Sequence, residues 1–238
     1  MEKLEIKSIM KIAGSLTNKN WFELSANLDC GKDENWDLAF HFFEERIRTR
    51  YINPIKAILA IEDNLGEGFA VLNLQCSLIE TIESFINGWK YDNKTNSWFT
   101  TKEKKIDLSS KKIFESFFDK RNLFNDNNNS KIDGENFYRY VRCGLLHESQ
   151  TKDNWKIRCN TSNNNVFYDK ITKEGTDEKI IYRANFQKAL EKLILDYEES
   201  IVNGVGLVEF SEFNKEQLRN NFSDKFNHIC TESEVKQK

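Results

Sequence analysis

The sequence predicts a mainly α protein, a helical bundle with an N-terminal helical extension and a small β-hairpin insertion. Three observations support this fold class. Apolar residues recur at helical spacing in several long segments. Proline occurs once in 238 residues, as Pro54, so little interrupts these segments. Alternation of apolar and polar residues, which is typical of strands, is confined to one region. Because each apolar stripe must be buried against another, a bundle is the simplest architecture.

The N-terminal extension covers residues 1–62. Helical spacing of large apolar residues predicts a helix over residues 34–52, and they are Trp36, Phe40, Phe43, Ile47 and Tyr51. Asn53 and Pro54 resemble a helix cap followed by the first position of a new, short helix over roughly 54–62.

The bundle core covers about residues 67–202. A continuous apolar stripe predicts a long helix over 67–90, followed by a polar connection at 92–104. Ser109 or Ser110 can cap a helix at about 110–120, and Asp133 can cap one at roughly 134–148. A β insertion is expected at about 154–183, where Trp155, Ile157 and Cys159 alternate with polar residues. Helices over about 186–202 and 214–230 complete a single domain over 1–238, because no linker divides the chain.

Composition and charge restrict the function. Hydrophobic residues make up 39% and aromatic residues 13%, which suits a globular protein and not a disordered one. The net charge of −3 gives no global attraction for nucleic acid, so an RNA site would have to be a local basic patch. The segment 139–158 offers five cations against two carboxylates, although it fits an ordinary solvated surface equally well.

The cysteines and the N-terminus point to a reducing compartment. The five cysteines are far apart and form no C-x-x-C pair, which favours free thiols. Residues 1–11 are charged and lack the apolar run of a signal peptide, and no stretch is apolar enough to span a bilayer. We therefore expect a cytoplasmic protein that has no membrane association. Neither metal-ligand spacing nor a cofactor-binding loop is present, so no metal and no cofactor are expected.

The stretch 137–150 (FYRYVRCGLLHESQ) carries the strongest chemical signal. Arg142 and His147 form an R-x4-H motif, and five helical residues separate them by roughly 140° and about 7.5 Å. They therefore border one broad polar face of the helix. Arg139, Cys143 and Leu146 lie between them on this face, and Phe137, Val141, Gly144 and Leu145 form the opposite, apolar side.

This face suits metal-independent RNA cleavage. Such cleavage removes the 2′-OH proton, stabilises a crowded phosphorane and protonates the leaving 5′-oxygen. An imidazole can act as acid or base, which suits His147 to these proton transfers, while Arg142 can bind two phosphate oxygens at once. One histidine and one arginine are few groups for these three tasks. Two such helices meeting at a two-fold axis would supply two histidines and two arginines, which predicts a homodimer.

Other interpretations fit the same residues. The motif by itself also fits a surface arginine followed by a histidine that stabilises the helix C-terminus. Gly144 costs about 1 kcal/mol relative to alanine inside a helix. It indicates either close approach of another helix or a glycine tolerated in ordinary packing.

The stretch YVRCGLLHESQT, late in a helix that follows a long bundle helix (FAVLNLQCSLIETIESFINGW, 69–89), resembles the HEPN superfamily (higher eukaryotes and prokaryotes nucleotide-binding). The resemblance covers about residues 67–150 and extends to the helix at 186–202. It implies an all-helical core and a metal-independent endoribonuclease with its site at a homodimer interface. It also implies a toxin–antitoxin or phage-defence role, with a possible cognate antitoxin or defence partner.

Carried over to this chain, the resemblance makes Arg142 the phosphate-binding residue and His147 the acid or base. Arg139 and Cys143 are candidate substrate-binding residues, and Glu83, a carboxylate within the apolar stripe of 67–90, is a candidate support for Arg142 or Arg139. Cys143 stands where that superfamily commonly has a polar residue. This departure and the acidic net charge favour a second hypothesis, a non-catalytic module that binds RNA, nucleotide or protein. A third is a structural helical protein in which the motif is accidental.

Overall fold

The computed structural model describes residues 9–61, 65–100, 102, 104–124, 131–159, 166–205 and 207–235. Of the described residues, 60% are helical and 15% lie in strands. The strands form three separate sheets. The predicted fold class, a mainly α helical bundle with one β insertion, is therefore wrong: the fold is mixed α and β, with a helical majority.

The helices follow the predicted apolar segments closely. Each predicted helix has a counterpart within a few residues, while the short helix α1 was not predicted. The α-helices are α1 (Asn18–Ser25), α2 (Trp36–Ile47), α3 (Asn53–Leu59), α4 (Glu67–Asn87), α5 (Ser110–Lys120), α6 (Gly134–Asn136), α7 (Cys143–Glu148), α8 (Arg183–Val202) and α9 (Lys215–Val235). Short 3₁₀ turns lie at Asn122–Phe124 and Leu207–Phe210, and π-helical turns at Arg48–Ile52 and Phe137–Arg142.

The predicted break at Asn53 does not occur. The helix runs on from α2 through the π-helical turn Arg48–Ile52 into α3, and the backbone N–H of Asn53 donates to the carbonyl of Arg48. In an α-helix, the ring of Pro54 would clash with the carbonyl four residues earlier. The wider π turn removes that conflict, so the proline widens the helix without ending it.

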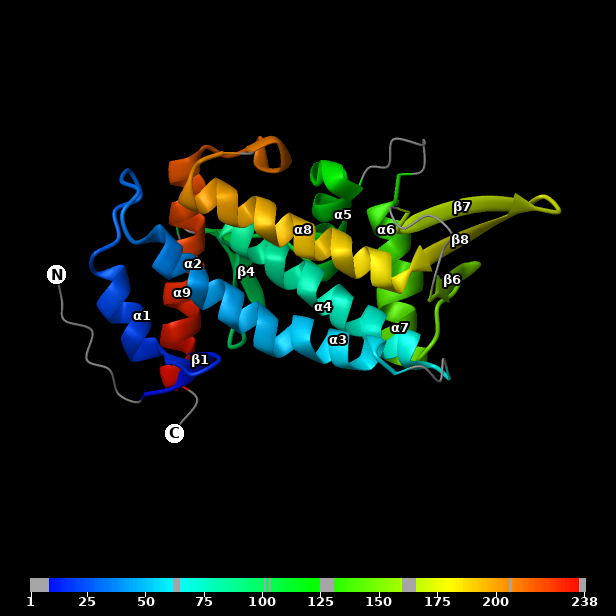
Figure 1. Cartoon of the computed structure of the whole chain (residues 1–238), viewed down its shortest axis with the longest axis horizontal. Coiled ribbons are helices and arrows are strands. Elements are labelled where there is room, and N and C mark those ends of the chain that lie inside the picture. The colour runs from blue at the N-terminus through cyan, green and yellow to red at the C-terminus, as the bar shows by residue number, and fades with distance from the viewer. Residues whose placement is uncertain are drawn as a thin grey trace.

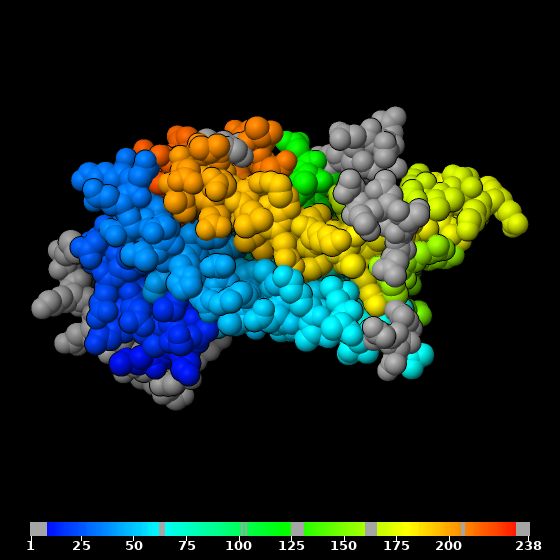
Figure 2. Space-filling view, viewed as in Figure 1, coloured from blue at the N-terminus to red at the C-terminus, as the bar shows by residue number. Residues whose placement is uncertain are grey.

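The β insertion is a three-stranded sheet of β6 (Trp155–Arg158), β7 (Tyr168–Lys173) and β8 (Thr176–Tyr182). β8 is the central strand, antiparallel to β7 and parallel to β6. Figure 2 shows the β7–β8 hairpin projecting from one end of the molecule. Residues 160–165, within the predicted β insertion, lie outside the described residues.

Two further sheets were missed. β1 (Lys11–Ala13) and β2 (Leu16–Thr17) form a hairpin within the predicted helical extension. β3 (Lys90–Asp92), β4 (Ser97–Phe99) and β5 (Lys105–Ile106) form an antiparallel sheet in and around the predicted polar connection. Strands of two or three residues are too short to show a period of two, so the alternation that revealed β6 could not reveal these.

Helix α4 is the central element. Figure 1 shows it between α8 and the continuous α2–α3 helix, with α9 crossing near one end and α7 near the other. α4 is long and apolar enough to cross a membrane, but 61% of its most apolar window is buried inside the protein. It is therefore a helix of the protein core.

Aromatic packing fixes α4 against α2 and α9. The rings of Phe43 on α2 and Phe85 on α4 meet edge to face at 4.8 Å, and Phe85 lies 4.9 Å from Phe226 on α9. Phe222 and Tyr197 complete this buried cluster. Such edge-to-face pairs add to the stabilisation from burial alone. They hold α2, α4 and α9 in the positions that shape the cavity described below.

Candidate functional site

The R-x4-H motif lies on a helix that runs through α6, the turn Phe137–Arg142 and α7, and that we call the motif helix. This helix is continuous but irregular. Asp133 caps it by accepting a hydrogen bond from the backbone N–H of Asn136 at 2.8 Å. α6 then passes into the π-helical turn Phe137–Arg142, which closes where the N–H of Cys143 donates to the carbonyl of Tyr138. Such turns occur frequently at functional sites. Arg142 is the last residue of this turn, directly before α7.

The predicted faces of this helix are confirmed. Its apolar side is buried, as Phe137, Val141, Gly144 and Leu145 show. On the other side Arg139, Leu146 and His147 are exposed, while Arg142 and Cys143 are partly buried. The helix therefore presents a polar front to the solvent while its back contributes to the core.

Arg142 is held by a carboxylate of α4. Its Nε lies 3.1 Å from Oε1 of Glu80, and only 24% of the Arg142 side chain is exposed. The guanidinium also lies over the ring of Tyr138, 5.7 Å from the ring centroid. Burial lowers the pKa of Arg142, but Glu80, with smaller contributions from Tyr138 and Cys143, more than offsets this and raises that pKa above its ordinary value.

His147 takes no part in this contact. It is exposed one residue before the C-terminal end of α7, and Ser149 ends the helix in the left-handed conformation at φ 55°. Within the described residues, no hydrogen bond or ion pair holds His147. The structure therefore does not bring Arg142 and His147 together in one protomer, in agreement with their separation of roughly 140° around the helix axis.

Glu83 has another partner. It is fully buried, and its carboxylate receives Nε of Arg121 at 3.1 Å, Oγ of Ser116 at 2.8 Å and Nδ2 of Asn87 at 2.9 Å. The structure corrects the expectation that Glu83 supports Arg142 or Arg139. Glu83 lies three positions after Glu80 in the sequence, so the two side chains leave α4 in different directions. Glu83 faces α5, and Glu80 faces the motif helix.

The remaining predicted residues show weaker features. Arg139 is exposed and lies 3.4 Å from Glu135 on the same helix. Cys143 hydrogen-bonds Tyr138, and this bond together with burial raises the pKa of the tyrosine. An added Cβ at Gly144 would lie 2.5 Å from the carbonyl oxygen of Gln150, so Gly144 permits close approach of its own chain after the helix.

The basic segment 139–158 is largely neutralised. Lys152 pairs with Glu148 and Lys156 pairs with Glu178, and both carboxylates hold pKa values below their ordinary range because of these lysines. Asp153 is bound by Lys179 at 2.7 Å. This segment is therefore an ordinary solvated surface, apart from Arg142.

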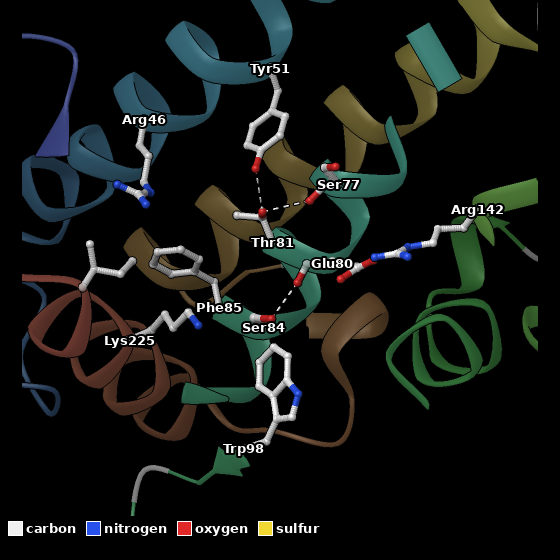
Figure 3. A pocket seen from close by; sticks show the side chains of 11 residues that line it. Arg46, Tyr51, Ser77, Glu80, Thr81, Ser84, Phe85, Trp98, Arg142 and Lys225 are labelled. Atoms are coloured by element: carbon white, nitrogen blue, oxygen red, sulfur yellow. Dashed lines mark hydrogen bonds and ion pairs between the residues drawn. The ribbon is translucent and has the colours of Figure 1, made fainter. Parts of the chain in front are cut away.

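A cavity of about 360 Å³ lies beside Arg142 and Glu80, which both line it (Figure 3). We call it the α4 pocket, because Ser77, Glu80, Thr81, Ser84 and Phe85 of α4 form its floor. Its walls are Arg46, Tyr51, Trp98, Arg142, Lys225 and Ile229. A second cavity, of about 490 Å³, adjoins it through Glu80 and Trp98.

Sequence reasoning missed Arg46, Lys225 and Trp98. Arg46 directly precedes Ile47 in the apolar stripe of its helix, and Lys225 directly precedes Phe226 in that of α9. A cation at the edge of an apolar stripe was the one available signal. It could not show that the two residues, 179 positions apart in the numbering, meet at one cavity.

The described part of the chain holds no group of three or more His, Cys, Asp or Glu residues that could bind a metal ion. In comparisons with known proteins, no family model, no curated protein and no solved structure matches the chain. These comparisons neither support nor contradict the HEPN resemblance.

Proposed function

We propose that the protein is a metal-independent endoribonuclease of HEPN type, cytoplasmic, with its active site at a homodimer interface. The toxin or phage-defence role and a cognate antitoxin or defence partner belong to this proposal through the resemblance alone. The observation that carries it is the placement of Arg142 and His147. They border the solvent-facing side of one helix whose other side is fixed in the core.

The chemistry assigns each residue a task. One imidazole removes the proton of the 2′-OH, whose oxygen then attacks phosphorus. The bond from phosphorus to the 5′-oxygen breaks, and a second imidazole donates its proton to that oxygen, leaving a 2′,3′-cyclic phosphate. The guanidinium of Arg142 offsets the charge that develops on the phosphorane. Two histidines and two arginines are needed, and a two-fold axis through the motif helices would supply them.

Exposed apolar residues near the motif support the dimer. Leu146, directly before His147, is 55% exposed, while Leu65 and Phe69 at the start of α4 are 88% and 37% exposed. α7 packs beside α4 at this end of the molecule (Figure 1). Large apolar side chains exposed at one end of a molecule are typical of interaction surfaces.

The test is cleavage of RNA in the presence of EDTA by the wild type, Arg142→Ala and His147→Ala. We expect the wild type to cleave and both variants to lose at least about a hundredfold in rate, with unchanged folding. Arg48→Ala is the control, because Arg48 is an exposed arginine outside the motif helix and pairs with Glu45. Equal cleavage by all variants would remove Arg142 and His147 as catalysts.

One observation favours a second function, a non-catalytic module that binds RNA, nucleotide or protein. Glu80 already occupies one side of the Arg142 guanidinium, as it would in a structural ion pair. Retained RNA binding without cleavage by the wild type, lost in Arg142→Ala, would favour this module over the enzyme.

A further inference from the structure

The α4 pocket contains positive charge that the described residues do not neutralise. Of its charged lining residues, Arg46, Arg142 and Lys225 are cations and Glu80 is the single carboxylate. Glu80 is bound to Arg142 at 3.1 Å. Arg46 and Lys225 therefore remain without a carboxylate partner among the residues that the structure describes, although both are partly buried.

In the part of the chain that the structure describes, the hydrogen bonds of these two cations go to backbone carbonyls. Nη1 of Arg46 donates to the carbonyl of Ile12 at 2.7 Å, and Nζ of Lys225 donates to the carbonyl of Trp89 at 2.6 Å. A guanidinium has five N–H donors and an ammonium three, so most donors of both residues are unused in these bonds. Unused charged donors at a cavity are the groups that bind an anion.

The two cations also act on one another. Burial, together with the neighbouring cations Arg46 and Lys90, lowers the pKa of Lys225 to about 7. Burial likewise lowers the pKa of Arg46 to about 10. Among the described groups, no carboxylate offsets either shift. Placing like charges together in a partly buried site costs free energy that a bound anion would recover.

The pocket also offers a flat apolar wall. Trp98 of β4 lines it, with Nζ of Lys225 5.8 Å from the centroid of its ring. Phe85 contributes to the floor (Figure 3). The hydroxyls of Ser77, Thr81 and Ser84 donate to carbonyls of their own helix, so they cannot donate to a ligand at the same time. Anion recognition therefore falls to Arg46 and Lys225, and an aromatic ring could stack on Trp98.

We propose that the α4 pocket binds a small phosphomonoester whose terminal phosphate lies between Arg46 and Lys225 and whose ring packs against Trp98. A terminal phosphate carries close to two negative charges near neutral pH, which matches two uncompensated cations. A phosphodiester carries one charge and matches them less well. This site does not depend on RNA cleavage, since neither Arg46 nor Lys225 belongs to the proposed catalytic pair.

The test is calorimetric titration of the full chain with phenyl phosphate, inorganic phosphate, methyl phenyl phosphate and phenol. We expect phenyl phosphate to bind most tightly, and the diester and phenol at least about tenfold more weakly. Arg46→Met and Lys225→Met should each weaken phenyl phosphate binding by about tenfold or more, and Trp98→Leu should bring its affinity down to that of inorganic phosphate.

Matched controls exist on the same helices. Arg48→Met removes an exposed arginine that pairs with Glu45, and Lys215→Met removes a lysine that pairs with Asp33 at 2.7 Å. Both should bind phenyl phosphate as the wild type does. Arg46→Lys and Lys225→Arg should retain most of the affinity, which separates lost charge from lost folding.

Binding should also be accompanied by proton uptake at pH 7.5, because an anion beside Lys225 favours its charged form. Titrations in buffers of different ionisation enthalpy measure this uptake, and Lys225→Met should abolish it. No saturable binding of phenyl phosphate, equal binding of the diester, or binding unchanged in both Arg46→Met and Lys225→Met would each overturn the proposal.

Discussion

The guanidinium of Arg142 and the carboxylate of Glu80 form an ion pair between the motif helix and α4, with Nε and Oε1 3.1 Å apart. Both side chains are less than one quarter exposed, at 24% and 22%. The pair lies at the boundary between the solvent front of the motif helix and the α4 pocket. Glu80 therefore competes with any phosphate for the same guanidinium.

We predict that Glu80→Gln tightens RNA binding. Removing the carboxylate leaves Arg142 free to bind phosphate and removes one negative charge near it, so affinity for a single-stranded RNA should rise by about two- to tenfold. The ion pair between Arg142 and Glu80 contributes little to stability, so we expect Glu80→Gln to lower the free energy of unfolding by about 1 kcal/mol or less. Fluorescence anisotropy measures the affinity. Glu23→Gln, which removes a carboxylate from the exposed pair with Lys19, is the control. Weaker binding by Glu80→Gln would mean that Glu80 orients Arg142 and does not compete for it.

Glu83 is predicted to matter for stability and not for RNA. It is fully buried together with Arg121, and Glu83→Ala leaves that guanidinium with Glu212 as its remaining carboxylate partner among the described residues. Removing one member of a buried pair costs about 3–5 kcal/mol. Urea denaturation should show this loss, whereas Glu135→Ala at an exposed pair should change the stability by about 1 kcal/mol or less. A Glu83→Ala protein as stable as the wild type would show that Glu212 alone compensates Arg121.

Much of the helical structure could be predicted, because long apolar stripes at a 3.6-residue period leave few alternatives. The buried side of the motif helix, including Phe137 and Val141, followed from the same pattern. The continuity of α2 and α3 did not, because it depends on a π turn that absorbs Pro54. The short strands β1 to β5 could not be predicted either, because their pairing depends on tertiary contacts and not on an alternation of apolar and polar residues along the chain.

The site was predictable in part. The R-x4-H motif located Arg142 and His147 and their angular separation, because both lie on one helix. Which glutamate reaches Arg142 depends on the rotation of α4 against its neighbours, and the sequence pattern could not distinguish Glu80 from Glu83. The meeting of Arg46 and Lys225 depends on tertiary packing between α2 and α9, which no local signal encodes.

Leu146 is predicted to hold the dimer together. Its side chain is 55% exposed and directly precedes His147, so Leu146→Glu should place a charge in the proposed interface and leave the monomer fold intact. Sedimentation should show a shift from dimer to monomer, with RNA cleavage lost in parallel. Leu195→Glu is the matched control, since Leu195 is equally exposed, at 55%, on α8. A monomeric wild type, or a dimeric Leu146→Glu protein, would contradict this interface.

Mixing two inactive variants tests whether one site draws on both protomers. The proposed cleft uses both imidazoles and both guanidinium groups of the dimer, so a heterodimer of Arg142→Ala and His147→Ala holds one of each and lacks a complete site. Equal mixing gives about half heterodimers, and cleavage by the mixture should stay as low as that of either variant alone. The two variants should be unfolded and refolded together, and each variant refolded alone serves as the control. Return of about one quarter of wild-type cleavage would mean that each site needs only one arginine and one histidine, drawn from different protomers.

Lys225 should make stability depend on pH in a defined direction. Burial lowers its pKa to about 7 in the folded protein, from an ordinary value of 10.5. Below pH 7 both the folded and the unfolded chain hold the proton, so the full cost of the buried charge is present. Between pH 7 and about 10 the unfolded chain holds a proton that the folded chain has lost. Stability should therefore rise with pH in this window, by at most about 1.4 kcal/mol per unit.

Urea denaturation of the wild type and Lys225→Met at pH 6, 7, 8 and 9 isolates this contribution, because other titrating groups cancel in the difference. The variant should be most stable relative to the wild type at pH 6 and 7, and its advantage should shrink at pH 8 and 9. The lost hydrogen bond to the carbonyl of Trp89 adds an offset that does not vary with pH. Lys215→Met should follow the wild type at every pH. A difference between wild type and Lys225→Met that stays constant from pH 6 to 9 would mean that Lys225 keeps its ordinary pKa, and the uncompensated charge inferred for the α4 pocket would then be absent.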